Sequence, residues 1–578
     1  MTRKVVVVAL DGATFDLVDP WAAQGRLPTL QRLMEGGTSA PLLSTVPPVT
    51  ACAWTAFLTG CNPGKTGIYE FFARRDPSSY KIYPIDRTLA LRPSLAAILS
   101  RHGVTVGQLH FPMTYPAEHI RGFVVAAPVP DKNSTHFTFP SDLLEQIGLS
   151  REEYVIHPFQ DPKFRRRLAA PDEESLDSIL HWVRNQARCT LKLAAELEWD
   201  VLMVHIWATD CVQHVFWKAM TEGHKGGWSK RLQGAILQVF READDLVAAL
   251  CRLAGPDALV GVVSDHGFGS NHHTFWVNCW LAQQGFLCFR DLLGEDALCA
   301  LLDRLWRRWR QRDTGHTLRR LKGVIRSVAR PAPVSFRRAI YSSIESLTQG
   351  HPKWSQRTSP MNSERFEYRV DWNRTVAYSF GNHGEIYINL KGREPRGIVE
   401  PGEEHQTIRE QVAEALLELT DDKGDPVFTA VKRQEELYWG EAMESAPDLV
   451  PLTHDRHSCY YNPNFGTGAV LTPPAPNRSG VHRPEGILVL HGPDVSVGRR
   501  VAAAHITDVA PTILGWMGLP IPEEMDGAVL RGFLPVLPPV TLVEPSAQPP
   551  DEPEDFSGYT SEEAQLVSQR LRDLGYVE

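Results

Sequence analysis

Cysteine is sparse in this chain: nine cysteines are scattered over 578 residues, none forms a Cys-x-x-Cys pair, and their number is odd. This distribution is typical of reduced, mostly buried thiols and argues against a disulfide framework or a structural zinc site. If the protein holds a metal ion, harder ligands than thiolate must bind it.

Long apolar runs and an excess of positive charge are also missing. No stretch approaches the ~18 consecutive apolar residues that a membrane span requires. The 60 Lys and Arg residues are outnumbered by 69 Asp and Glu residues, which gives a formal net charge of −9. A general nucleic-acid binder carries the opposite balance, because it must displace the counterions of the phosphate backbone, so we expect no nucleic-acid partner.

The first residues resemble the start of a signal peptide, because two basic residues at positions 3 and 4 precede an apolar run at residues 5–10. The run is too short for a signal peptide, and Asp11 and Asp16 follow where a cleavage site belongs. We therefore expect a mature N-terminus and a cytoplasmic protein.

Several apolar runs without polar alternation predict strands that are buried on both faces of a sheet. The first is at residues 5–10, and three more lie at residues 200–206, 258–264 and 487–490. Helical stretches at residues 176–198 and 233–253 precede the second and third runs. This alternation of buried strands and helices predicts an α/β fold with a mostly parallel central sheet.

Two regions depart from this pattern. Residues 291–364 are strongly basic, with apolar residues at spacings of three and four, and are interpreted as a helical cap inserted into a core of residues 1–290 and 365–534. A solvated basic face is the favoured interpretation of this cap, and contact with an anionic substrate or a membrane surface is the alternative. Residues 535–560, rich in proline and acidic residues, predict a linker before a helical tail at residues 561–578.

Carboxylates and imidazoles follow three of the predicted strands. Asp11 follows the first strand, Asp210 and His214 follow the second, and Asp265 and His266 follow the third. Each one alone is better explained as a turn residue, a helix cap or a surface pair. Open α/β sheets place their sites at the carboxyl ends of strands, however, so we expect these side chains to converge. Such ligands suit zinc, manganese or iron, and two clusters suit a pair of ions that supports displacement at phosphorus.

A two-metal site of this kind needs a nucleophile, and Thr50 is the best candidate. It stands directly before a run, residues 51–58, that is predicted to form a helix. A hydroxyl at a helix N-terminus lies where the helix dipole favours an anion. From the local sequence alone, a simple capping role for Thr50 remains the better explanation.

Further motifs extend this set along the chain. Together they comprise residues 10–12, 27–30, 36–37, 50–60 and 62–68, the pair Asp210 and His214, and residues 265–267, 480–486, 506–514 and 525–527. In this order they resemble the alkaline phosphatase superfamily, specifically its type I phosphodiesterase/nucleotide pyrophosphatase branch. The resemblance implies an alkaline-phosphatase-like three-layer sandwich, with the basic helical cap as an insertion.

The resemblance also implies a set of metal ligands and a mechanism. Two divalent ions are expected, most favourably Zn²⁺, with Mn²⁺ or iron as alternatives. Thr50 faces both ions, attacks phosphorus and forms a phosphothreonine that a second displacement cleaves. One ion is held by Asp210, His214 and His482, and the other by Asp11, Asp265 and His266. His482 is identified only through the resemblance, because the chain has 21 histidines, and His205, His272, His273, His383 and His491 are its rivals.

The substrate is expected to be a small phosphate ester, and a diester is favoured. No arginine lies near Thr50 in the sequence, whereas Trp54, Phe71 and Trp207 offer an apolar wall for a second ester group. Residues 69–72 lack the asparagine that nucleotide pyrophosphatases tend to carry there, which puts nucleotide specificity in doubt. A phosphomonoesterase or phosphotransferase of the same superfamily is the alternative, and a non-catalytic scaffold that keeps the fold is an alternative of another class.

Overall fold

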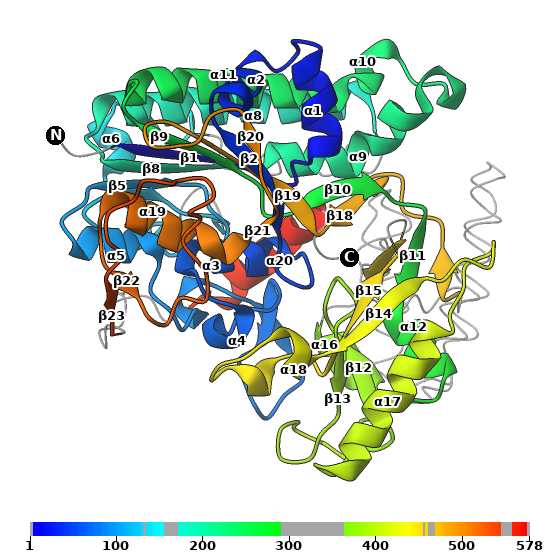
Figure 1. Ribbon diagram of the computed structural model, residues 1–578. Helices are drawn as coiled ribbons and strands as arrows, with labels where there is room; N and C mark the ends of the chain where they lie inside the picture. Colours follow the sequence, from blue (N-terminus) through cyan, green and yellow to red (C-terminus); the bar gives the residue numbers. More distant parts are fainter. Residues whose placement is uncertain are drawn as a thin grey trace.

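A sheet of ten strands forms the centre of the protein (Figure 1). The structure is a computed structural model that describes residues 4–130, 134–154, 171–290, 363–454, 457–460, 469–544 and 558–574. The strand order is β20-β2-β19-β9-β1-β8-β5-β6-β7, with β21 paired to β2. The strands are β1 (Val5–Leu10), β2 (Thr38–Leu43), β5 (Val106–Leu109), β6 (Gly122–Val125), β7 (Thr138–Phe139), β8 (Val201–Ile206), β9 (Leu259–Val263), β19 (Glu485–His491), β20 (Arg499–Arg500) and β21 (Ala504–His505).

The middle of this sheet is parallel, as the sequence predicts. Strand β1 pairs in parallel with β8 on one side and β9 on the other, so that Val5 lies opposite both Val201 and Leu259. Every residue of these three strands is buried, which explains why their sequences show no polar alternation. The predicted strand at 487–490 is also present as part of β19, but it runs antiparallel to β9.

Helices cover both faces of the sheet, which gives the predicted three-layer sandwich (Figure 1). One face carries α1 (Phe15–Ala23), α2 (Pro28–Gly36), α8 (Glu173–Glu196) and α11 (Ala235–Ala254). The other face carries α3 (Thr50–Thr59), α5 (Leu95–Arg101) and α19 (Val509–Met517). Helix α9 (Ala208–Glu222) follows β8 directly and packs against α8 and α11. The parallel order of β1, β8 and β9 brings the carboxyl ends of these strands to one edge of the sheet.

A second lobe has its own sheet and its own hydrophobic cluster, at the lower right of Figure 1. Its sheet has the order β12-β13-β15-β14, and α17 packs against it. The sequence patterns predicted no boundary between these residues and the core. The lobe contains α12 (Val277–Gln283), α16 (Ser363–Arg369), β12 (Ala377–Ser379), β13 (Ile386–Ile388), α17 (Glu403–Leu417), β14 (Phe428–Arg433) and β15 (Leu449–Thr453).

Shorter elements join the two lobes and the edges of the core. Strands β10 (Gly267–Ser270) and β18 (Gly480–Arg483) pair antiparallel beside the ends of β9 and β19. Strand β11 (His273–Trp276) lies between β16 (His457–Tyr460) and β17 (Leu471–Thr472). The rest are β3 (Phe72–Arg74), β4 (Ile82–Pro84), β22 (Ile521–Pro522), β23 (Leu542–Val543), α4 (Pro63–Thr66), α6 (Leu143–Gln146), α10 (Lys230–Gln233) and α18 (Gln434–Leu437).

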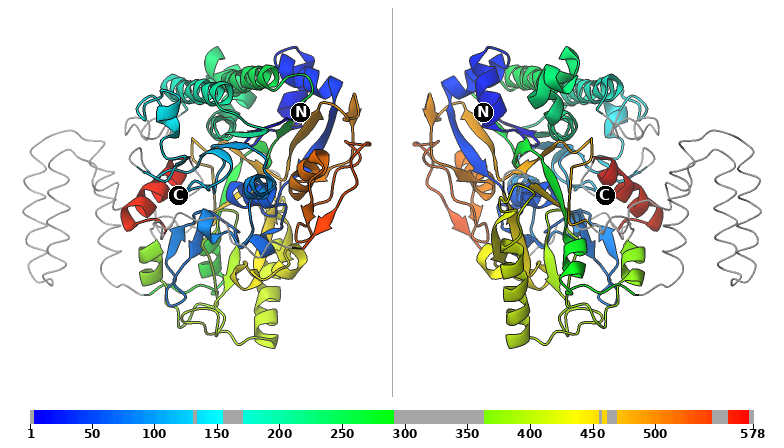
Figure 2. Two further views of the ribbon diagram at one scale, coloured as in Figure 1. Left: turned by 90° about the vertical axis from the view of Figure 1, so that its left-hand side faces the viewer. Right: turned by 90° about the vertical axis from the view of Figure 1, so that its right-hand side faces the viewer.

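The C-terminal tail forms the predicted helix, α20 (Ser561–Leu574), which packs beside β4 (Figure 2). Its Val567 and Leu571 are buried, and Tyr559 stacks on Tyr115 just before the helix. The predicted basic cap falls outside the described residues up to residue 362, as do residues 545–557 of the predicted linker. Their structure, the domain boundaries and the cytoplasmic location stay predictions. Within the described ranges, no helix combines the length and apolar character of a membrane span.

Candidate active site

The side chains that follow β1, β8 and β9 meet at the carboxyl edge of the sheet, where the sequence places them. Asp11 ends the first of these strands, Asp210 lies in the first turn of α9, and Asp265 precedes His266 between β9 and β10. His482 comes from β18, whose pairing with β10 brings it beside them. All seven predicted core residues are buried: Asp11, Thr50, Asp210, His214, Asp265, His266 and His482.

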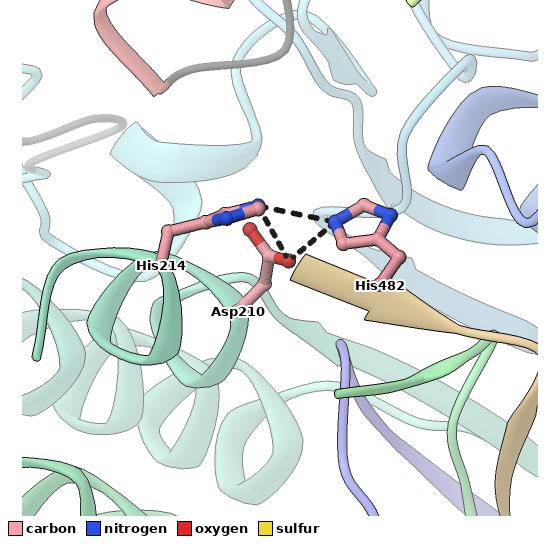
Figure 3. A group of neighbouring side chains, drawn as sticks. All are labelled: Asp210, His214 and His482. Carbon is pink, nitrogen blue, oxygen red and sulfur yellow. Dashed lines mark hydrogen bonds and ion pairs between the residues drawn. The ribbon is translucent and has the colours of Figure 1, made fainter. Parts of the chain in front are cut away.

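Asp210, His214 and His482 form one group of potential metal ligands (Figure 3). The Oδ1 atom of Asp210 lies 3.1 Å from Nε2 of His482 and 3.4 Å from Nε2 of His214. Asp210 and His214 share one face of α9 because they are four residues apart. His482 closes the group from the opposite side, as the picture shows.

Backbone contacts fix the tautomers of the histidines in this group. Nδ1 of His214 donates to the carbonyl oxygen of Gly480 at 2.9 Å, and Nδ1 of His482 donates to that of Pro48 at 3.0 Å. A carbonyl oxygen only accepts, so the proton of each neutral ring lies on Nδ1 and the lone pair lies on Nε2. Such a contact is the usual outer support of a metal-binding histidine.

Asp11, Asp210 and His266 form a second group, so that Asp210 takes part in both. Nε2 of His266 lies 3.5 Å from Asp11 Oδ1 and 3.3 Å from Asp265 Oδ2. Those two carboxylate oxygens are buried and have no hydrogen-bond partner among the described residues. A buried oxygen without a donor is costly, and a cation is the partner that would satisfy both.

Burial shapes the electrostatics of the site. It raises the pKa of Asp11 and of Asp265 well above the ordinary value, and like charges on neighbouring carboxyls raise both further. Burial also lowers the pKa of His214, His266 and His482 well below the ordinary value. The site therefore gathers carboxylates around neutral imidazoles, and divalent cations fit this donor set.

Thr50 is the first residue of α3, not its cap. Val49 occupies the cap position, so the simple capping role considered for Thr50 is wrong. The Thr50 hydroxyl instead lies 3.3 Å from Nε2 of His266. Because Nδ1 of His266 donates to the carbonyl oxygen of Gly267, Nε2 is the acceptor in this contact and Thr50 donates its proton.

Two donors orient Asp11, and sequence reasoning anticipated neither contact. Oδ2 of Asp11 accepts from Nε1 of Trp54 at 3.1 Å and from Nε2 of His205 at 2.8 Å, which leaves Oδ1 facing His266. Trp54 is fully buried with its indole on Asp11, and its contact with substrate stays a prediction. Phe71 and Trp207 are also buried, and their contact with substrate stays a prediction.

Gly12 connects the turn after β1 to the histidines. Its φ of +69° lies in the left-handed region, and its N–H donates to Oδ1 of Asp265 at 3.2 Å. A Cβ at this position would lie 2.8 Å from a ring carbon of Phe268. The ring centroid of Phe268 in turn lies 4.8 Å from that of His214. The glycine therefore permits the close packing of these loops.

Comparison with known families agrees with this geometry. Residues 5–470 match the family described as type I phosphodiesterase / nucleotide pyrophosphatase. The chain belongs to this family. It is therefore a phosphodiesterase/nucleotide pyrophosphatase-like phosphoric ester hydrolase, and the scaffold alternative is set aside. A comparison with curated proteins gave no match.

Several solved structures resemble this hydrolase at low sequence identity. Phosphonoacetate hydrolase from Sinorhizobium meliloti 1021, in complex with phosphonoformate, is 13% identical with a TM-score of 0.50, covering 88% of this chain and 94% of its own. Murine ectonucleotide pyrophosphatase / phosphodiesterase 5 is 12% identical with a TM-score of 0.45, covering 89% and 95%. Its inactive form in complex with AMP gives the same identity and coverage with a TM-score of 0.44.

Arg478 is a cation beside these histidines that the sequence patterns did not single out. Arg478 is buried, four residues before His482 in the chain. Burial lowers the pKa of His214, of His383 and of His482, and the charge of Arg478 lowers all three further. Arg478 is far from Thr50 in sequence, and its position four residues before His482 was the signal that could have found it.

Proposed function

We propose that this enzyme cleaves phosphodiesters through a covalent phosphothreonine on Thr50. The observation that supports this most directly is the position of the Thr50 hydroxyl. It lies at the start of α3, 3.3 Å from His266, beside two groups of buried ligands that share Asp210. A divalent ion held by these ligands would lower the pKa of the threonine hydroxyl, so that it can lose its proton as it attacks.

The proposed metal site divides its ligands into two sets. Asp210, His214 and His482 hold one divalent ion, and the second set is Asp11, Asp265 and His266. Zn²⁺ is favoured because Asp and His oxygen and nitrogen ligands without thiolate suit it, and Mn²⁺ and iron are the alternatives. When bound, the two ions supply an acidified nucleophile and stabilise charge on the attacking and leaving oxygens.

Thr50 carries the group transfer. Its oxygen forms a bond to phosphorus as the bond from phosphorus to the leaving ester oxygen breaks. Water then attacks phosphorus, the bond to Thr50 breaks, and the threonine hydroxyl is restored. The N-terminus of α3 points its dipole at the phosphoryl group during both steps.

A diester is the proposed substrate, and a small phosphate ester of nucleotide-like size is its class. The aromatic residues Phe71 and Trp207 support this choice, because a second ester group requires an apolar wall. Arg478 favours a second candidate, a monoesterase, because a buried arginine can neutralise the additional charge of a dianionic phosphate. The two candidates differ in which substrate turns over faster.

The test compares hydrolysis of three substrates after addition of Zn²⁺ or Mn²⁺: bis-p-nitrophenyl phosphate, the p-nitrophenyl ester of thymidine 5′-phosphate, and p-nitrophenyl phosphate. We expect faster turnover of the diesters, and a loss of roughly 10³-fold or more in Thr50→Ala with metal content unchanged by elemental analysis. Thr59→Ala, which removes a hydroxyl from the far end of the same helix, is the matched control. Faster monoester turnover would select the second candidate, and full activity in Thr50→Ala would remove Thr50 as the nucleophile.

A further inference from the structure

The second lobe sends one loop to the histidines of the active site. This loop, residues 380–385, connects β12 to β13. The ring of His383 lies 5.5 Å from the ring of His482, centroid to centroid. His383 is partly exposed, whereas the seven core residues of the site are buried. It therefore lies at the rim of the site, between the buried ligands and solvent.

Two buried carboxylates hold this loop in place. Oε1 of Glu70, which follows α4 in the core, accepts from the backbone N–H of Asn382 at 2.8 Å. Oε2 of Glu385 accepts from the backbone N–H of His383 at 3.0 Å. Glu70 is 2% exposed and Glu385 is 0% exposed. The hydrogen bonds that two successive backbone N–H groups donate to buried carboxylates restrict the position of the loop that carries the imidazole.

The loop has little room to take another shape. A Cβ on Gly381 would lie 1.9 Å from Oε2 of Glu385, so the carboxylate packs directly on the backbone there. Arg478 also acts electrostatically on both His383 and His482. His383 is thus an imidazole at the rim of the site whose backbone is held in place.

The geometry of in-line attack relates the position of the leaving group to that of Thr50. Thr50 is completely buried, so a phosphate ester reaches it from the solvent side of the cluster. An in-line attack puts the leaving oxygen opposite the Thr50 oxygen. His383, partly exposed beside His482, is a candidate to meet a group that departs on the solvent side.

We propose that His383 contacts the leaving group of the substrate and donates a hydrogen bond to its oxygen, and that Glu70 is the positioning residue that keeps His383 there. This inference rests on the proposed phosphate ester hydrolysis through Thr50. It adds a specificity-determining residue from the second lobe to a site otherwise built by the core.

The experiment measures kcat and KM for a series of aryl methyl phosphates whose leaving phenols range from acidic to weakly acidic. A weakly acidic leaving group depends more on hydrogen bonding, because more charge must be stabilised on its oxygen. We expect His383→Ala to lower kcat/KM about tenfold for the least acidic phenol and by less than about threefold for p-nitrophenol. Glu70→Gln should shift the series in the same direction by a smaller factor, with bound metal unchanged in both variants.

His102→Ala, which removes an exposed histidine at the end of α5, is the control and should leave the series unchanged. An equal loss for every leaving group, or no loss in His383→Ala, would overturn the inference while the proposed function stands, provided wild type is active and Thr50→Ala is not. A wild-type protein that hydrolyses none of these esters would overturn both.

Discussion

The Nε2 atoms of His214 and His482 lie 3.1 Å apart, while the Nδ1 atom of each ring donates to a backbone carbonyl. Two lone pairs at this distance repel one another unless a positive charge lies with them. The nearest carboxylate, Asp210, adds a negative oxygen within 3.4 Å of both nitrogens. The pair is therefore suited to hold a cation and not to form a hydrogen bond between the rings.

Removal of metal should lower both stability and activity. We expect chelation to lower the midpoint of thermal unfolding and added Zn²⁺ to restore it. An ion whose free concentration is about 100 times its dissociation constant raises the free energy of unfolding by about 2.7 kcal/mol. Differential scanning fluorimetry with elemental analysis measures this. His482→Ala should lose bound metal, whereas His505→Ala, an exposed histidine in β21, should keep it. Equal metal content in the two variants would contradict the assignment of His482.

The indole of Trp54 should matter through Asp11. Trp54→Phe keeps the aromatic volume but removes one of the two donors to Oδ2 of Asp11. We expect a loss of about 10-fold or more in metal affinity or activity, as is usual when the outer support of a ligand is removed. Trp199→Phe removes a similar indole hydrogen bond, to Ala194, and serves as the matched control for stability. If both variants lose activity equally, the effect is one of folding.

The buried carboxyl of Glu70 should make stability depend on pH. Burial raises the pKa of Glu70 to about 7 from an ordinary 4.5. Between these values the folded chain keeps a proton that the unfolded chain has released, so this group makes stability fall as pH rises through that window, by up to about 1.4 kcal/mol per pH unit.

Glu70→Gln removes this titration. As the pH is raised from 5 to 8, the urea midpoint of the variant should therefore rise relative to that of wild type. Losing one acceptor for the Phe71 and Asn382 amides adds a cost that does not depend on pH. Parallel midpoints for the two proteins across this range would show that Glu70 is not protonated in the fold.

Arg478 should discriminate between charge states of the substrate. Arg478→Met is expected to lower kcat/KM for p-nitrophenyl phosphate about tenfold more than for bis-p-nitrophenyl phosphate, because a dianion loses more electrostatic stabilisation than a monoanion. Arg231→Met, which breaks exposed ion pairs with Glu173 and Asp177, should change neither. An equal loss on both substrates would assign Arg478 a structural role instead.

The sequence was sufficient for the central sheet and most of the site because both depend on local patterns. The buried apolar run of β1 ends in Asp11, and the corresponding ends of β8 and β9 lead to Asp210 and Asp265. Parallel strands bring such positions to one edge wherever the helices between them lie. The family resemblance added His482, which no spacing along the chain could have supplied.

Contacts between distant segments could not be predicted in this way. The sequence around Trp54 shows only an apolar helix, yet its indole N–H meets a carboxylate 43 residues away. Glu70 and Asn382 are 312 residues apart, and no periodic pattern links them. The first contact depends on how α3 packs on the end of β1, and the second on how the second lobe docks on the core. The alternation of strands and helices encodes neither.

The crowding around Gly12 limits which amino acids position 12 of this enzyme can hold. Any larger residue there would push Phe268 towards the imidazole of His214 and would also strain the turn that gives an N–H to Asp265. A library randomised at position 12 should therefore return glycine alone among active clones, even though residue 12 itself has no side chain with which to touch a substrate.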